Sequence, residues 1–576
     1  MKKLISVLLV IIMAFSCAMP AFASKGVEHL PIIVLVGDGT QIYMPDETAE
    51  NGERNVWDDL FDTLSGEGKI VESVANILLP FLTEGLLFDK WDNYYDAFYE
   101  EIEPLFDPLR MDGDGNPRYN TGLGKEDLHN NATSCKQNPY LWNGVYGTND
   151  YVFRYDWRRD PIEVADELHE YILKVMDTTQ KNSPNKRVNI AANCLGGSYV
   201  LAYLAKYGTD GHIKNVFFNA TVGNGTDLLT DAYCGDIVLN DAALQRFLYQ
   251  NAEKDGESLA GLLKTTPFIN ELVLTSYDLL AQTGVVESLG LTFDSLYQKI
   301  YAGLVPKLAI AIFATMPGYW SVVLPERYEE ARDFVFGKEG DEMYEEYKGL
   351  VGKLDNYYET VSSKKLGIIE KCQAAGVHFG ASAKYGYQMY PFVKSQSELG
   401  DQLVDLEHAS FGATVAPNVY ATLSDEHIQA AIKGGTDKYI SPDNMVDAST
   451  SIFKNSLWIF KNVSHDNTSF DYPLIAEFCR NTEFTINSSS KYPQYHILLP
   501  DTMERDPETG ALSNSTGDVV PMTKENCNLT IWDEMPEESK EEPTIGSRII
   551  AFFRWLTAMI KFILHISSEH PGEMPA

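Results

Sequence analysis

The sequence predicts an α/β fold, in which a mostly parallel sheet carries helices on both faces. Short apolar, β-branched runs alternate with helical segments along the chain, which is typical of parallel β–α–β units. A chain of 576 residues with 44% hydrophobic and 22% charged residues has the composition of a large globular protein. The length exceeds what one ordinary domain needs, so we expect a core with large insertions.

Six apolar runs are the predicted strands of the sheet. They cover residues 31–36, 151–155, 188–192, 215–220, 375–384 and 457–462. Helices are predicted from Asp160 to about 177 and over 197–207. The core therefore falls into a first part, 24–224, and a second part, 371–484. We expect an insertion over about 41–150, a large, mainly helical cap or lid over 225–370 and a small β extension over 485–533.

Both ends of the chain carry segments outside this core. Residues 1–23 resemble a secretory signal peptide, with two lysines, an apolar stretch and a small-residue cleavage site, so we expect a secreted protein. Residues 534–544 are an acidic linker. Residues 545–566 carry a basic stripe on an otherwise apolar helix, which favours contact with a membrane interface over a membrane span. A cell-surface location through this helix is the corresponding expectation.

Charge and cysteine content exclude several classes of protein. A net charge of −36 argues against nucleic acid as a partner. Seven cysteines are too few for a disulfide scaffold, and their pairing stays open. The loop that begins at Asp112 has the spacing of a calcium loop, but its twelfth position is Leu123 instead of Glu. We therefore expect no metal and no cofactor.

The most informative segment is the turn after the strand 188–192. It reads Ala192-Asn193-Cys194-Leu195-Gly196-Gly197 and leads directly into a predicted helix. Small residues on both sides of a central nucleophile are typical of a nucleophile elbow, where strand and helix pass close together. A helix N-terminus favours a thiolate, so Cys194 is the candidate nucleophile. The alternative is a buried structural cysteine.

A nucleophile on such a sheet needs an acid and then a histidine later in the chain. His465 follows the strand 457–462 and is the candidate base, ahead of His378 and His408. Two acids fit, Asp401 and Asp443, and we prefer Asp401 because it comes soon after the strand 375–384. Either aspartate could instead only shape a turn.

Acyl chemistry also needs N–H donors for an oxyanion. The backbone N–H of Leu195, directly after the nucleophile, is the first candidate. The second is expected from the loop Gly37-Asp38-Gly39 after the first strand, and we assign the N–H of Asp38.

Four segments together resemble a known family. These are the strand and glycine loop 31–37, the motif Tyr155-Asp156-Trp157-Arg158, the turn 192–197, and Met316–Trp320 with Leu324-Pro325. They resemble the lecithin:cholesterol acyltransferase family of α/β-hydrolases. The resemblance implies a lid-bearing α/β-hydrolase that hydrolyses or transfers acyl groups of lipid-like esters. It also implies that Cys194, His465 and Asp401 or Asp443 are the catalytic residues.

One departure from that family bears on function. The family carries Ser at the position of Cys194, and a thioester can pass its acyl group to water or to another acceptor. The leading hypothesis is a secreted acyl hydrolase or acyltransferase that acts on a lipid or other ester. The alternative is a catalytically inactive hydrolase fold used for cell-surface binding. A thiol peptidase is a third, weaker reading.

Overall fold

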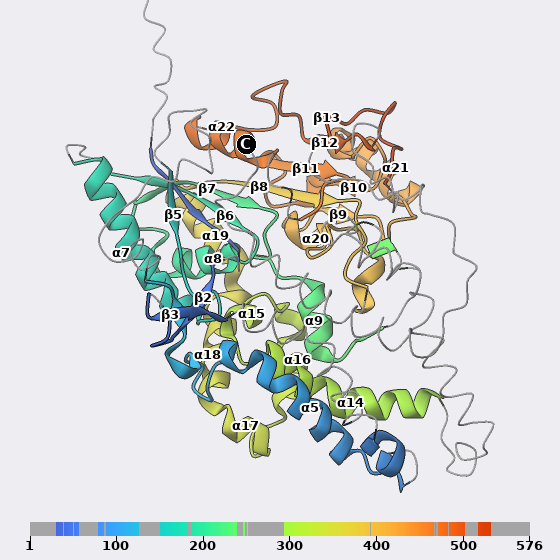
Figure 1. Cartoon of the computed structure of the whole chain (residues 1–576). Helices are drawn as coiled ribbons and strands as arrows, with labels where there is room; N and C mark the ends of the chain where they lie inside the picture. The colour runs from blue at the N-terminus through green and yellow to red at the C-terminus, as the bar shows by residue number, and fades with distance from the viewer. Residues whose placement is uncertain are drawn as a thin grey trace, which may run out of the picture.

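The computed structural model describes residues 30–37, 40–49, 51–56, 79–85, 88–125, 150–181, 186–238, 293–391, 393–465, 470–481, 483–500 and 517–531, and also positions 76, 243, 246, 247, 250 and 467. These residues form an α/β fold around one mostly parallel sheet (Figure 1). The segments expected as leader, acidic linker and terminal amphipathic helix lie outside the described residues.

The central sheet has eight strands in the order β13-β12-β11-β8-β7-β6-β1-β5. All neighbouring strands run parallel except β12 and β13, which are antiparallel. Each of the six predicted strands overlaps one of them. Their bounds are β1 (Ile32–Leu35), β5 (Asp150–Phe153), β6 (Val188–Asn193), β7 (Ile213–Asn219), β8 (His378–Tyr385), β11 (Leu457–Lys461), β12 (Tyr495–Leu498) and β13 (Val519–Pro521).

The strand order changes direction at β1. The chain goes from β1 to β5 on one side and then to β6 on the other, so β1 lies between them. In open parallel sheets, ligands bind in the crevice that such a reversal leaves at the carboxyl ends of the strands. The residues after β1 and β6 are therefore the place to look for a site.

Two layers of helices cover the sheet. Alternate strand residues enter different buried clusters, for example Ile33 and Leu35 on one face and Ile32 and Val34 on the other. The first face packs against α7 (Pro161–Thr179), α8 (Gly196–Tyr207) and α19 (Lys365–Ala374), and the second against α22 (Asp471–Arg480) (Figure 1). This alternation is what a sheet buried on both faces requires.

Local sequence explains where the helices beside the site begin. Asp160 caps α7, because its carboxylate accepts the backbone N–H of Ile162 at 2.9 Å while Pro161 occupies the first helical position. The next helix, α8, begins at Gly196, only two residues after Cys194. Both features agree with the predicted helix starts.

The insertion after β1 contains a small antiparallel sheet and one long helix. The sheet is formed by β2 (Ile42–Pro45), β3 (Glu53–Asn55) and β4 (Gly122–Leu123), and the helix is α5 (Asp92–Phe106). α5 packs against α14 (Phe293–Ile312) through Trp91, Tyr94 and Leu304. Among the described residues, no helix combines the length and hydropathy needed to cross a bilayer.

The described parts of the segment expected as a helical cap, mainly residues 225–238 and 293–370, are helical, and the last of them packs on the core. They contain α9 (Asp227–Cys234), α14, α15 (Pro317–Trp320), α16 (Tyr328–Phe336), α17 (Glu342–Glu346), α18 (Lys348–Thr360) and the start of α19. The Tyr357 hydroxyl of α18 contacts the Ser198 carbonyl of α8 at 3.4 Å, and α19 packs on α8. α19 is the last helix before β8, and the cap boundary predicted at 370 falls within it.

The small β extension predicted over 485–533 is not a separate unit. Its strands, β12 and β13, continue the central sheet beyond β11. The reason is that Tyr495 to Leu498 is fully buried and pairs in parallel with β11, which a detached hairpin would not do. Two short strands elsewhere, β9 (Thr414–Val415) and β10 (Val446–Asp447), form a pair of their own.

Candidate active site

Cys194 occupies a strained turn between β6 and α8. Its φ is +47°, a left-handed conformation that costs a residue with a side chain about 1–2 kcal/mol. Several hydrogen bonds hold the peptide in place. The N–H of Cys194 donates to the Asn219 carbonyl at 3.3 Å, and its carbonyl accepts from Thr221 Oγ1 at 2.8 Å, Gly197 N at 3.1 Å and Val222 N at 3.2 Å. The turn thus presents the half-buried thiol at the carboxyl edge of the sheet.

The two glycines after Cys194 are required by close packing. A Cβ atom on residue 196 would lie 2.9 Å from the Leu35 carbonyl oxygen, and one on residue 197 only 1.7 Å from Thr221 Oγ1. The start of α8 therefore passes against the ends of β1 and β7 with no room for a side chain. This confirms the close strand–helix approach that the glycine pair predicted.

The loop after β1 lies directly against the thiol. A Cβ atom on Gly37 would be 2.9 Å from Cys194 Cβ and 3.3 Å from its Sγ. The Tyr155 hydroxyl fixes this loop, because it donates to the Val36 carbonyl at 2.7 Å and to the Gly37 carbonyl at 3.2 Å. Tyr155 is thus a positioning residue whose role the sequence did not reveal, although its motif was noted.

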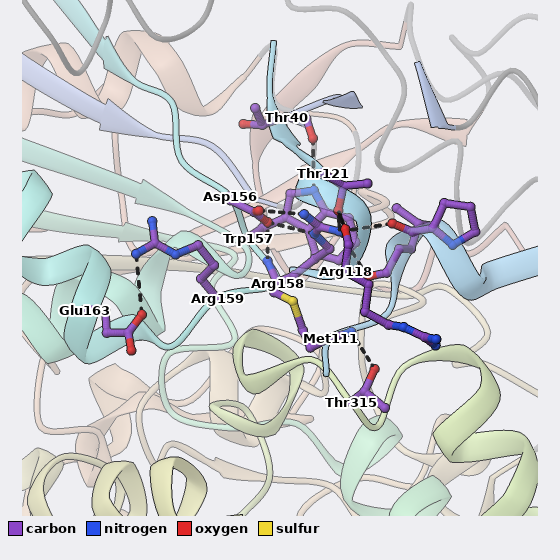
Figure 2. A network of polar contacts seen from close by, with 12 residues as sticks. Thr40, Met111, Arg118, Thr121, Asp156, Trp157, Arg158, Arg159, Glu163 and Thr315 are labelled. Carbon is purple, nitrogen blue, oxygen red and sulfur yellow. Dashed lines mark hydrogen bonds and ion pairs between the residues drawn. The ribbon is translucent and has the colours of Figure 1, made fainter. Parts of the chain in front are cut away.

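The rest of that motif ties the same loop to the first insertion (Figure 2). Trp157 Nε1 donates to the Thr40 carbonyl at 2.9 Å. Arg158 is fully buried, forms an ion pair with Asp156 at 2.7 Å and donates to Thr121 Oγ1 at 3.0 Å. Since these residues act on the backbone around the site, the motif supports the site without contributing a reacting group.

The structure brings His465 and Asp401 together beside Cys194. His465 Nδ1 lies 2.9 Å from Asp401 Oδ2, and the His465 backbone N–H donates to the Asp401 carbonyl at 2.9 Å. The His465 side chain also interacts electrostatically with Cys194. Asp401 is fully buried and His465 is 7% exposed. The three side chains that the sequence analysis named, Cys194, His465 and Asp401, therefore lie together at one place in the structure.

Electrostatics in this chain favour a charged imidazole. Burial opposes protonation of His465, but the Asp401 carboxylate and Cys194 outweigh it and raise the pKa of His465 well above its usual range. A protonated His465 between a carboxylate and the sulfur is the partner that a thiolate requires.

Asp443, the other acid considered, serves a different network. Its Oδ2 accepts from the Tyr385 hydroxyl at 2.6 Å and from Lys461 Nζ at 3.0 Å, and its Oδ1 accepts from Ser441 Oγ at 2.6 Å. These partners occupy the carboxylate, so the geometry pairs Asp401 with His465. Sequence spacing alone could not separate the two, because the partners of Asp443 come from distant strands.

The two weaker histidine candidates also have other partners. The His378 ring stacks on Phe478 with 4.7 Å between ring centroids, and burial lowers its pKa. His408 Nε2 lies 3.2 Å from Asp227 Oδ2. Neither arrangement directs an imidazole at Cys194.

Of the two oxyanion donors expected, only one lies in the described part of the chain. Leu195 precedes the first residue of α8, where backbone N–H groups point out of the helix start. Its nitrogen is 3.7 Å from the position that a Cβ on Gly37 would take, so it faces the loop after β1. Asp38 lies outside the described residues.

A buried ion pair beneath the histidine was missed by the sequence analysis. Lys384 Nζ lies 2.8 Å from Asp471 Oδ2, and both side chains are fully buried. The same ammonium donates to the carbonyls of His465 at 3.3 Å and Asn467 at 2.8 Å. Lys384 therefore anchors the loop that carries His465. A lysine within the apolar strand β8 was the available signal, because a buried cation needs a buried anion.

The loop at Asp112 and the cysteines are the remaining features that the sequence analysis considered. Asp112 Oδ1 accepts the backbone N–H groups of Asp114 at 3.0 Å and Asn116 at 2.8 Å, so this loop is a side-chain-stabilised turn. Among the described cysteines, Cys194, Cys234, Cys372 and Cys527 carry free thiols.

Comparison with known proteins identifies no family. No protein-family profile and no curated protein sequence matches the chain. Among solved structures, the chain is similar to one described as the crystal structure of the Tle4-Tli4 complex, at 12% sequence identity and a TM-score of 0.23. That similarity covers 69% of this chain and 80% of the other. At this level the similarity carries no functional information.

Proposed function

We propose that the protein is an acyl hydrolase or acyltransferase that uses Cys194 as its nucleophile. The single observation that carries the proposal is that Cys194, His465 and the buried Asp401 lie together at the carboxyl edge of a parallel sheet, with His465 hydrogen-bonded to Asp401 and coupled electrostatically to Cys194. A thiol, an imidazole and a carboxylate in this order are the parts of covalent acyl transfer.

The chemistry runs through a thioester. The Cys194 thiolate attacks the carbonyl carbon of an ester, and the oxyanion that forms is stabilised by the Leu195 N–H and by a donor from the loop after β1, where Asp38 is our candidate. The C–O bond then breaks, and His465 protonates the departing alcohol. In the second half, His465 takes a proton from water or another acceptor, which attacks the thioester and releases the acyl group and the thiolate.

The fold type that we propose is an α/β-hydrolase. The nucleophile follows β6, the acid follows β8 and the histidine follows β11, which is the chain order of that fold. The elbow after β6 lies at the point where the strand order reverses, between the neighbouring strands β1 and β6, which is the place favoured for ligands. Membership in the lecithin:cholesterol acyltransferase family stays a proposal that rests on the four sequence segments.

A lipid-like ester is the proposed substrate class. Support comes from the apolar helix α14 in the cap and from the amphipathic pattern of residues 545–566, which suits a membrane interface. The leader-like pattern of residues 1–23 supports secretion. The net charge of −36 means that attachment to an anionic membrane depends on the apolar face of the terminal helix.

The test compares ester hydrolysis by three proteins: the chain without residues 1–23, its Cys194→Ala variant and its Cys234→Ala variant. Cys234 is a matched control, because it is also half-buried but burial raises the pKa of its thiol to about 12. With nitrophenyl esters of rising chain length and a fluorescent phospholipid, Cys194→Ala should lose at least roughly 100-fold in kcat/KM. Cys234→Ala should match the parent protein.

Two results would contradict the proposal. Equal hydrolysis by the parent and Cys194→Ala proteins would remove Cys194 from the reaction. No hydrolysis by any folded, reduced protein would favour the alternative of an inactive hydrolase fold that serves in binding.

A further inference from the structure

A second group of metal-ligating side chains lies far from Cys194. His169 comes from the middle of α7, and Asp210 and His212 come from the turn between α8 and β7. One ligand atom from each residue lies within 4.8 Å of the others. This turn leads into the amino end of β7, whereas Cys194 follows the carboxyl end of β6, so the two groups lie at opposite edges of the parallel sheet.

The two imidazoles carry unsatisfied nitrogen atoms. Nδ1 of His169 and Nδ1 of His212 are both buried and have no hydrogen-bond partner in the described part of the chain. Leaving such an atom without a partner costs free energy, and buried polar atoms in folded proteins nearly always have one. A bound cation is one way to satisfy an imidazole nitrogen.

A second cluster of potential metal ligands in the described residues differs from the first, because its polar atoms have partners. Asp227, Asp405 and His408 also lie close enough to share an ion. Their atoms already serve one another: Asp405 Oδ2 accepts from Asp227 N at 3.1 Å, its Oδ1 accepts from His408 N at 3.0 Å, and His408 Nε2 lies 3.2 Å from Asp227 Oδ2. That cluster is satisfied without an ion, so it carries no proposal.

The scaffold around His169 and His212 is rigid. His169 stacks on Tyr207 of α8, with ring centroids 3.9 Å apart and 15° between the planes. The His212 carbonyl accepts the Val188 N–H at 2.8 Å, which fixes it between β6 and β7. Asp210 is the exposed member of the group. Contacts within the fold thus hold the two imidazoles in place.

We propose that His169, Asp210 and His212 bind a Zn²⁺ ion that ties α7 to the start of β7. Two imidazole nitrogens and one carboxylate oxygen, with water as the fourth ligand, form a donor set that zinc accepts, whereas Ca²⁺ and Mg²⁺ prefer oxygen ligands alone. Tetrahedral zinc places its ligand atoms roughly 3.3 Å apart, so a modest rotation of Asp210 completes the site. The ion strengthens the fold and takes no part in the reaction at Cys194.

The test is a titration of the full chain with ZnCl₂ by calorimetry. The protein carries no affinity tag, and its reactive thiols are first alkylated with iodoacetamide, because Cys194 and His465 could bind zinc themselves. Three variants are compared. Asp210→Asn removes an exposed ligand, His169→Phe keeps the ring stacked on Tyr207 but removes both nitrogens, and Asp177→Asn is a control on the same helix that is 76% exposed.

The expected result is one Zn²⁺ per chain for the parent protein and for Asp177→Asn. Affinity should fall at least roughly tenfold in Asp210→Asn and further in His169→Phe. Zn²⁺ should raise the melting temperature of the parent but not of Asp210→Asn, and Ca²⁺ or Mg²⁺ should not. Co²⁺ should give visible absorption bands without the thiolate charge-transfer band.

Three results would overturn the proposal. They are no saturable binding, equal affinity in Asp210→Asn and Asp177→Asn, or unchanged affinity in a folded His169→Phe protein. Because Asp210 is exposed, its variant should fold even if His169→Phe does not, so the titration decides the question in either case.

Discussion

Replacement of Asp401 by Asn tests how the acid acts on His465. Asp401 Oδ1 accepts the backbone N–H groups of Leu403 at 3.2 Å and Val404 at 2.9 Å, and Oδ2 faces His465 Nδ1 at 2.9 Å. In Asp401→Asn the amide oxygen must stay with the two N–H donors. The amide NH₂ group therefore faces Nδ1 and donates to it, which forces the ring proton onto the other nitrogen.

That change removes the imidazolium. With Asp401 present both ring nitrogens of His465 carry protons, but an amide NH₂ group cannot accept the Nδ1 proton, so the ring becomes neutral and no longer partners a Cys194 thiolate. The same exchange in Ser–His–Asp triads lowers kcat by about 10⁴. We expect a loss of about 10³–10⁴ in kcat/KM, equal to about 4–5 kcal/mol of transition-state stabilisation. Because the two N–H donors remain bonded, the fold should be unchanged.

Asp443→Asn is the matched control for this experiment. Asp443 neutralises Lys461, whose side chain is only 9% exposed, so this variant leaves a buried cation without its anion. We expect a loss of about 3–5 kcal/mol in the free energy of unfolding and less than a tenfold change in kcat/KM. Both variants are assayed by nitrophenyl ester hydrolysis and by urea unfolding. Full activity in Asp401→Asn, or loss of activity in folded Asp443→Asn, would refute the assignment.

Three further predictions follow from the same contacts. In Gly37→Ala the new methyl group should displace the Cys194 side chain and lower kcat/KM by roughly 100-fold. The circular dichroism spectrum should stay unchanged. Unchanged kinetics would mean that the loop after β1 does not hold the thiol. Lys384→Met should lower the free energy of unfolding, measured with urea, by about 3–5 kcal/mol because Asp471 loses its buried partner. The double variant Lys384→Met with Asp471→Leu should recover most of this loss. No recovery would contradict the role of the ion pair. Since the pKa of His465 is raised, its imidazolium persists at neutral pH and is lost only as the pH rises through that elevated value, so at pH 7 iodoacetamide should alkylate Cys194 faster in the parent protein than in His465→Ala. Equal alkylation rates in the two proteins would exclude the pairing of His465 with Cys194.

The parallel sheet and the elbow could be predicted because both leave short-range signals. Apolar, β-branched runs mark the strands, and the glycines 196 and 197 mark a helix that starts against a strand. The choice between Asp401 and Asp443 had no such signal. It depends on Lys461 and Tyr385, which are close to Asp443 only after β8 and β11 have paired.

The boundaries were less predictable because they depend on tertiary packing. The run at 495–498 is too short to tell a detached hairpin from an edge of the main sheet, and only its parallel pairing with β11 decides. In the same way, the sequence of α19 does not distinguish it from a cap helix, and only its packing on α8 assigns it to the core. The role of Tyr155 also depends on its contacts with Val36 and Gly37, which lie 119 and 118 positions earlier in the chain.

The central claim is that Cys194 forms a covalent acyl-enzyme. The most direct measurement mixes the protein with a slowly hydrolysed nitrophenyl ester, quenches the reaction in acid and determines intact mass and the modified peptide by mass spectrometry. We predict one acyl group per chain on Cys194, formed much more slowly in His465→Ala and absent in Cys194→Ala. Ester turnover with no acyl group on Cys194, or with the acyl group on another residue, would contradict the account.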